Sequence, residues 1–89
     1  MSRSKIICYD LCASGRNYDD LYKYIKSYAI WAHVTESTWF ISTDKTCVDI
    51  KNDLKRIVDS NDRIFVAELT GTAAGYNILC NSEYLTENL

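Results

Sequence analysis

The chain of 89 residues has room for one small domain, and its 47% hydrophobic and 25% charged residues are ordinary proportions for a folded one. These proportions exclude a disordered tail, a collagen-like fibre and a low-complexity linker. The net charge of -2 is not that of a strong general nucleic-acid binder. The apolar stretch after the N-terminus covers only residues 6–9, so we expect no secretory leader and a cytoplasmic protein. The stretch from Ala29 to Ala32 is too short to cross a bilayer, so we expect no membrane span.

The first half of the chain predicts a strand, a helix and a two-stranded hairpin. Residues 5–10 form a β-branched and aromatic run that is typical of a strand. Asn17 followed by Asp20 is typical of a capping box at the start of a helix. The apolar residues of this helix recur at helical spacing: Tyr18, Leu21, Ile25 and Tyr28. Residues 29–34 and 38–43 then predict two strands joined by a short turn.

The second half of the chain predicts another helix and another strand. Thr46 with Asp49 is a second capping signal. The apolar residues that follow it form one helical face: Cys47, Ile50, Leu54 and Ile57. Residues 63–69 are β-branched and aromatic enough to predict a strand, and residues 76–80 optionally add a short fifth strand.

The order of these elements is that of a ferredoxin-like βαββαβ sandwich, which is an α+β fold. We expect one such domain over residues 1–80 and a C-terminal tail over residues 81–89. Right-handed crossovers give the strand order 4-1-3-2 and place both helices on one face of the sheet. The other face is apolar and open, which favours a homodimer that covers it.

The predicted strand directions bring scattered polar residues to one end of the sheet. We expect eight residues to meet there: Asp10, Ser14, Arg16, His33, Glu36, Ser37, Asp62 and Arg63. Because these residues come from different strands and turns, this end of the sheet is the candidate functional site.

Asp10 is the most informative residue of this group. It ends an apolar strand, where a carboxylate is costly to bury unless it is paired or binds a metal. Hard divalent cations such as Mg²⁺ take carboxylate oxygens and keep several waters, so Asp10 is a candidate magnesium ligand and catalytic residue. The alternative is a structural carboxylate that caps the first helix or pairs with Arg16 or Arg63.

His33 and Ser37 are the other candidate catalytic residues. A histidine can act as a general acid or base near neutral pH, but a lone histidine flanked by Trp31 and Val34 also suits a packed structural role. Ser37 is a candidate nucleophile, although the order of residues in the chain gives no argument for a Ser-His-Asp arrangement. Three residues are candidates for binding a substrate phosphate: Ser14, Arg16 and Arg63.

Several segments resemble the Cas-two-like superfamily, which comprises the CRISPR-associated Cas-two proteins, the VapD-type toxins and the small SinR-family proteins. The resemblance covers about residues 5 to 80 and lies in Cys8-Tyr9-Asp10-Leu11, the Tyr18/Leu21/Ile25 helix, Ser37-Thr38-Trp39-Phe40-Ile41 and Asp62-Arg63-Ile64-Phe65-Val66. Four pieces are most similar to the SinR-family branch: Trp31-Ala32-His33, Ser37-Thr38-Trp39, Thr70-Gly71 and Ala74.

The resemblance implies a ferredoxin-like homodimer in which the last strand crosses to the partner. It also implies that Asp10 matches the aspartate of the first strand in that superfamily. In its nuclease members, two copies of this aspartate face each other across the dimer axis and bind one divalent metal. Such a metal can activate water and stabilise charge on a phosphodiester, so the resemblance favours a metal-dependent endonuclease or phosphodiesterase that acts on nucleic acid.

A non-catalytic dimeric binding or scaffold module is the alternative. Its ligand would be nucleic acid, protein or a small nucleotide, in CRISPR or other antiviral defence or in counter-defence. The acidic balance of the chain favours this alternative, as does the lack of a second acidic residue beside Asp10 in the sequence.

Overall fold

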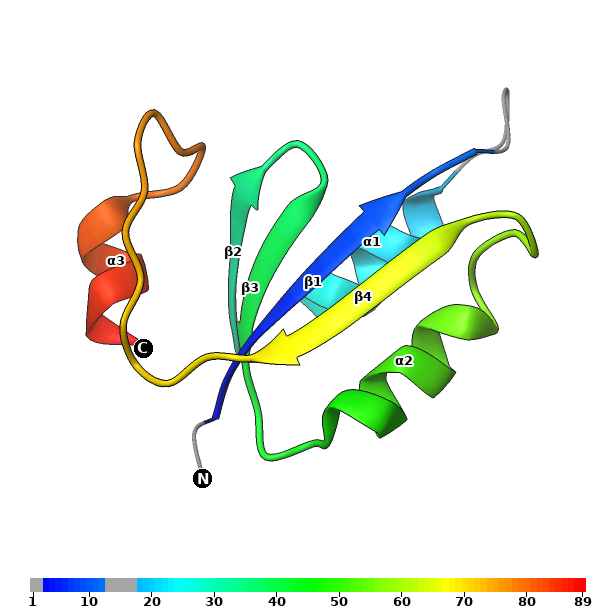
Figure 1. Ribbon diagram of the computed structural model, residues 1–89, viewed down its shortest axis with the longest axis horizontal. Helices are drawn as coiled ribbons and strands as arrows, with labels where there is room; N and C mark the ends of the chain where they lie inside the picture. Colours follow the sequence, from blue (N-terminus) through cyan, green and yellow to red (C-terminus); the bar gives the residue numbers. More distant parts are fainter. Residues whose placement is uncertain (1–2, 13–17) are drawn as a thin grey trace.

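Four strands and three helices make up the protein. The computed structural model describes residues 3–12 and 18–89. In chain order its elements are β1 (Ser4–Asp10), α1 (Asp19–Lys26), β2 (Ile30–Thr35), β3 (Thr38–Ser42), α2 (Cys47–Lys55), β4 (Arg63–Glu68) and α3 (Ser82–Glu87) (Figure 1). Among the described residues, each of these helices is too short or too polar to cross a membrane.

The strands form one antiparallel sheet in the order β2-β3-β1-β4, which is the order expected from right-handed crossovers. Figure 1 shows α1 behind β1 and β4 and α2 alongside β4, whereas α3 lies apart from both, beyond β2. The molecule is therefore a small α+β protein with a four-stranded sheet, an arrangement that is compatible with a ferredoxin-like fold.

The core lies between the sheet and the helices α1 and α2. Alternate residues of the strands face the helices, because successive side chains of a strand point to opposite faces. The buried cluster consists of Ile7, Tyr9, Leu21, Ile25, Trp39, Ile41, Ile50 and Leu54. Burying each large side chain contributes about 1.5–3 kcal/mol, so this cluster is the main source of stability.

The two helices on the sheet begin differently. The predicted cap of α2 is confirmed, because the Thr46 hydroxyl oxygen accepts a hydrogen bond from the backbone N–H of Asp49 at 3.1 Å. At α1, Tyr18 occupies the N-cap position, and its phenol donates a hydrogen bond to Asp62 at 3.0 Å. The predicted capping residue Asn17 lies outside the described residues.

The optional fifth strand over residues 76–80 is not formed. Asn77 has a φ of +54°, a left-handed conformation that interrupts an extended chain. Only Leu79 bonds to the sheet edge there, through its N–H to the carbonyl oxygen of Val34 at 2.9 Å. The expected tail over residues 81–89 instead contains α3, whose first turn is capped by the Asn81 side chain, which accepts from two backbone N–H groups.

Residues 69–89, the C-terminal segment, cover part of the sheet face that we expected to be open. They enclose an apolar cavity of about 110 Å³ against the sheet, lined by Ile6, Val34, Thr38, Phe40, Leu69, Ala73, Ala74, Gly75, Ile78, Leu85 and Leu89. Phe40 is fully buried as a result. The chain therefore covers the middle of its own sheet face.

The remainder of that face stays uncovered where β1 ends and β4 begins. We call this area the uncovered end and define it by Cys8, Asp10, Arg63 and Phe65. In the pairing of β1 with β4, Cys8 lies opposite Phe65 and Asp10 opposite Arg63, so all four belong to the same face. Asp10 and Arg63 are exposed, and Phe65 is 64% exposed.

Candidate functional site

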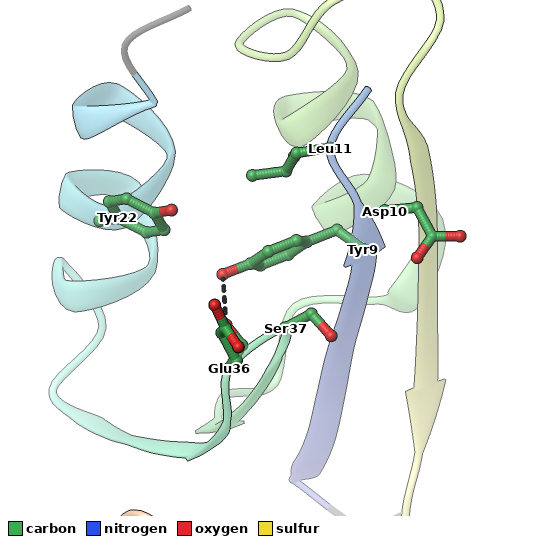
Figure 2. A pocket seen from close by; sticks show the side chains of 6 residues that line it. All are labelled: Tyr9, Asp10, Leu11, Tyr22, Glu36 and Ser37. Atoms are coloured by element: carbon green, nitrogen blue, oxygen red, sulfur yellow. Dashed lines mark hydrogen bonds between the residues drawn. The ribbon is translucent and has the colours of Figure 1, made fainter. Parts of the chain in front are cut away.

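A pocket of about 280 Å³ opens at the end of the sheet where the sequence predicts the site (Figure 2). Tyr9, Asp10 and Leu11 reach it from the end of β1, and Tyr22 reaches it from α1. The turn between β2 and β3 contributes the rest of the lining, Glu36 and Ser37. Of the eight residues expected to meet at this end, the pocket brings together Asp10, Glu36 and Ser37.

The β2–β3 turn is held in place by hydrogen bonds to both neighbouring strands. The backbone N–H of Tyr9 donates to the carbonyl oxygen of Ser37 at 3.1 Å, and the Tyr9 phenol donates to that of Glu36 at 3.3 Å. Nε2 of His33 lies 3.1 Å from the same Glu36 oxygen. A carbonyl oxygen only accepts, so this nitrogen carries the hydrogen. These bonds fix the backbone from which Glu36 and Ser37 project.

Tyr9 is a rigid and neutral wall of the pocket. Its phenol oxygen accepts a hydrogen bond from the Trp39 indole Nε1 at 2.9 Å, and burial raises the pKa of the phenol. Because the hydroxyl both accepts from Trp39 and donates to Glu36, Tyr9 serves the structure of the turn.

Asp10 differs from the other lining residues in the direction of its side chain. Figure 2 shows that its carboxylate leaves β1 on the side opposite Tyr9 and points away from Glu36. Within the described residues this carboxylate makes no hydrogen bond and no ion pair. Arg63, its neighbour in the β1–β4 pairing, instead directs Nη1 toward the Cys12 sulfur at 3.7 Å. Of the structural alternatives, the pair between Asp10 and Arg63 is not formed, and the other candidate partner, Arg16, lies outside the described residues.

Asp62 has the structural role that Asp10 lacks. Its Oδ1 accepts from the backbone N–H of Cys12 at 2.7 Å and from the Tyr18 phenol at 3.0 Å. Its Oδ2 accepts from the backbone N–H of Asp59 at 2.8 Å. Asp62 therefore ties together the end of β1, the start of α1 and the turn before β4.

His33 lies on the helix side of the sheet, whereas Asp10 lies on the other side. Its ring stacks on the indole of Trp39, with centroids 3.9 Å apart and planes 4° from parallel. This arrangement matches the packed structural role that the sequence left open for His33. Ser37 is exposed on the turn, and the candidate residues Ser14 and Arg16 lie outside the described residues.

Sequence reasoning did not single out Tyr22 as a site residue and placed Glu36 at this end without a role. Tyr22 follows Leu21, which belongs to the apolar face of α1, so its side chain lies at the border of that face. The sequence signal that could have indicated a site here is an aromatic residue at the border of the apolar face, together with an acidic residue in the turn.

Residues that could hold a metal do not cluster in the part of the chain that the structure describes. Over residues 3–12 and 18–89, the His, Cys, Asp and Glu side chains form no group of three or more suited to a metal ion. Asp10 can therefore contribute one carboxylate, and a divalent cation bound there needs further oxygen ligands from water or from another chain.

No protein-family model matches the chain, and no solved structure matches it. The candidate site is therefore argued from its own geometry.

Proposed function

We propose that the protein is a homodimer of ferredoxin-like subunits and that the dimer is a magnesium-dependent phosphodiesterase acting on nucleic acid. One observation carries this proposal. The carboxylate of Asp10 is exposed and without a hydrogen-bond or ion-pair partner in the described part of the chain, so its oxygens are open to a cation at the end of a central strand.

The uncovered end is the surface through which two copies would meet. A two-fold contact brings the same patch of both subunits together, so each residue near the axis faces its own copy. Phe65, which is 64% exposed, supplies apolar area for such a contact, and Asp10 shares its face of the sheet. A dimer of this kind supplies two carboxylates, which is a usual number for Mg²⁺ together with waters.

The residues around Asp10 suit a phosphodiester substrate. A bound Mg²⁺ would polarise a phosphoryl oxygen and lower the pKa of a bound water. Arg63 is exposed beside Asp10, and its guanidinium is able to bind phosphate oxygens in a bidentate manner. Asp10 would hold the cation, and Arg63 would orient the phosphate against it.

A specific observation favours a second candidate, a dimeric module that binds without catalysis. His33, the only histidine, is stacked on Trp39 and uses Nε2 for the carbonyl of Glu36. His33 therefore lies away from Asp10 and cannot act there as a general base. A site without such a base suits binding better than catalysis, unless a cation activates the water.

The test compares wild-type protein with Asp10→Asn on labelled RNA and DNA in Mg²⁺ or Mn²⁺. Asp44→Asn is the matched control, because Asp44 is an exposed aspartate outside the pocket whose partner is Arg3. Cleavage by the wild type and the control, lost in Asp10→Asn, supports the enzyme. Equal cleavage by all three proteins contradicts it, and a stable dimer without cleavage favours the binding module.

A further inference from the structure

The pocket beside Asp10 has walls and polar groups that the proposed phosphodiesterase activity of the protein does not use. We propose that this pocket binds a guanine base, with the ring against Tyr22 and its Watson–Crick edge on the carboxylate of Glu36. This inference rests on the proposed function for its substrate class, because it places a guanine across the end of β1 from the phosphate bound at Asp10.

The size and walls of the pocket suit one nucleobase. Its volume of about 280 Å³ lies just below the range for ligand pockets, roughly 300–1,000 Å³, as suits a small ligand. In Figure 2 the rings of Tyr22 and Tyr9 approach the hollow from α1 and from β1, and Leu11 extends toward Tyr22 above Tyr9. The ring of Tyr22 also packs against the ring of Trp39, with the centroids 6.2 Å apart and an angle of 31° between the planes, and this contact supports its position. Aromatic side chains of this kind stack on bases.

Glu36 supplies the base-specific contact. Its side chain is exposed and, among the described residues, its carboxylate has no hydrogen bond or ion pair of its own. A carboxylate only accepts, through two adjacent oxygens. Guanine offers two adjacent donors on its Watson–Crick edge, N1–H and the N2 amine, whereas each of the other three bases has only one donor position on that edge. Glu36 therefore selects guanine over the other three bases.

The turn that carries Glu36 is organised before any ligand binds. Tyr9 donates to the carbonyl oxygens of both Glu36 and Ser37, and His33 bonds to that of Glu36. Little backbone entropy is then lost on binding, which favours affinity at a small site. This assigns a purpose to the hydrogen bonds of Tyr9 and His33, which position the turn that carries Glu36.

The base and the phosphate would lie on opposite sides of the end of β1. Tyr9 and Asp10 are consecutive, and their side chains leave the strand in opposite directions (Figure 2). The Glu36 carboxylate repels an anion, so the pocket accepts the uncharged base and leaves the phosphate to Arg63 and the cation at Asp10.

The test measures binding of GMP, AMP, CMP and UMP by calorimetry in EDTA, so that metal and cleavage play no part. Wild-type protein is expected to bind GMP about tenfold more tightly than the other nucleotides. Glu36→Gln is expected to lose this preference, because an amide presents only one acceptor. Glu83→Gln on α3 is the matched control and keeps the preference. Tyr22→Leu is expected to weaken binding of all four nucleotides while circular dichroism shows an intact fold.

Two comparisons complete the design. A short RNA with one guanine, measured against GMP, shows whether the base is taken from a strand or as a free nucleotide, and either result supports the site. Equal affinity for the four nucleotides, or binding of arginine amide without any nucleotide, overturns it. Guanine preference without cleavage overturns only the proposed enzyme, and Asp10-dependent cleavage without guanine preference overturns only this inference.

Discussion

Asp10 and Asp62 lie at the same end of the sheet, and their surroundings are opposite. Three donors bind the carboxylate of Asp62, from the end of β1, from Tyr18 and from the turn before β4. The carboxylate of Asp10 has none within the described residues. A carboxylate whose oxygens already accept hydrogen bonds from several segments holds the fold together. An exposed carboxylate without such bonds is available to a cation or ligand. The comparison separates a structural from a candidate functional residue.

The largest expected effect is on activity at Asp10. Asp10→Ala removes both carboxylates proposed to hold the cation, one from each subunit, so the cleavage rate should fall on the order of 100-fold or more. Asp62→Ala, assayed at a temperature where it is folded, should change the rate much less. Similar losses in the two variants would remove the functional distinction between these aspartates.

The next effect is on stability and has the reverse pattern. Asp62→Ala leaves three donors without their acceptor, which should lower the free energy of unfolding by about 2 kcal/mol. Asp10→Ala should change it by less than about 0.5 kcal/mol, as for other surface sites. Urea unfolding followed by circular dichroism measures both values. A larger loss of stability for Asp10→Ala than for Asp62→Ala would show that Asp10 has a structural partner.

A smaller effect is expected at the surface that Asp10 shares with Phe65. Phe65→Lys places a charge in the proposed dimer contact and should weaken dimerisation about tenfold. Val48→Lys is the control, because Val48 is 61% exposed on α2, close to the 64% of Phe65, and lies outside the uncovered end. Light scattering after gel filtration measures the mass. A dimer unaffected by Phe65→Lys would place the subunit contact elsewhere.

A third aspartate, Asp53, extends the comparison to pH. Lys45 bonds to its carboxylate and lowers its pKa, with help from the Tyr24 phenol at 2.8 Å. A lowered pKa in the folded state means that this contribution to stability is present above the unfolded pKa of about 3.9 and is lost as the pH falls below it. Thermal unfolding between pH 7 and pH 2 should therefore show a shallower acid decline in Asp53→Asn than in wild type. Identical declines would argue against this contribution.

Much of the fold follows from local patterns in the sequence. The helical faces around Leu21 and Ile50 and the capping pair of Thr46 with Asp49 could be predicted because spacing and cap chemistry act over a few residues. The predicted fifth strand is wrong because Asn77 turns the chain left-handed and Asn81 starts a helix. Residues 69–89 cover part of the sheet through tertiary contacts, which cannot be predicted from the periodicity of the sequence.

The candidate site likewise has features that follow from local patterns and others that depend on tertiary contacts. Strand direction places Asp10 and Ser37 at one end of the sheet, and both line the pocket there. Strand alternation puts the Asp10 side chain on one face and His33 on the other, a distinction that residue type alone does not give. The hydrogen bonds of Asp62 come from donors far apart in the sequence, so only the folded structure shows which aspartate accepts hydrogen bonds.

The most direct test of the account is the stoichiometry of Mn²⁺ binding, measured by calorimetry alongside the mass of the protein in solution. The account predicts one ion for every two chains in the wild type, no such binding in Asp10→Ala, and an unchanged dimer in both. Equal Mn²⁺ binding by the two proteins, or a stable wild-type protein that binds no Mn²⁺, would contradict it.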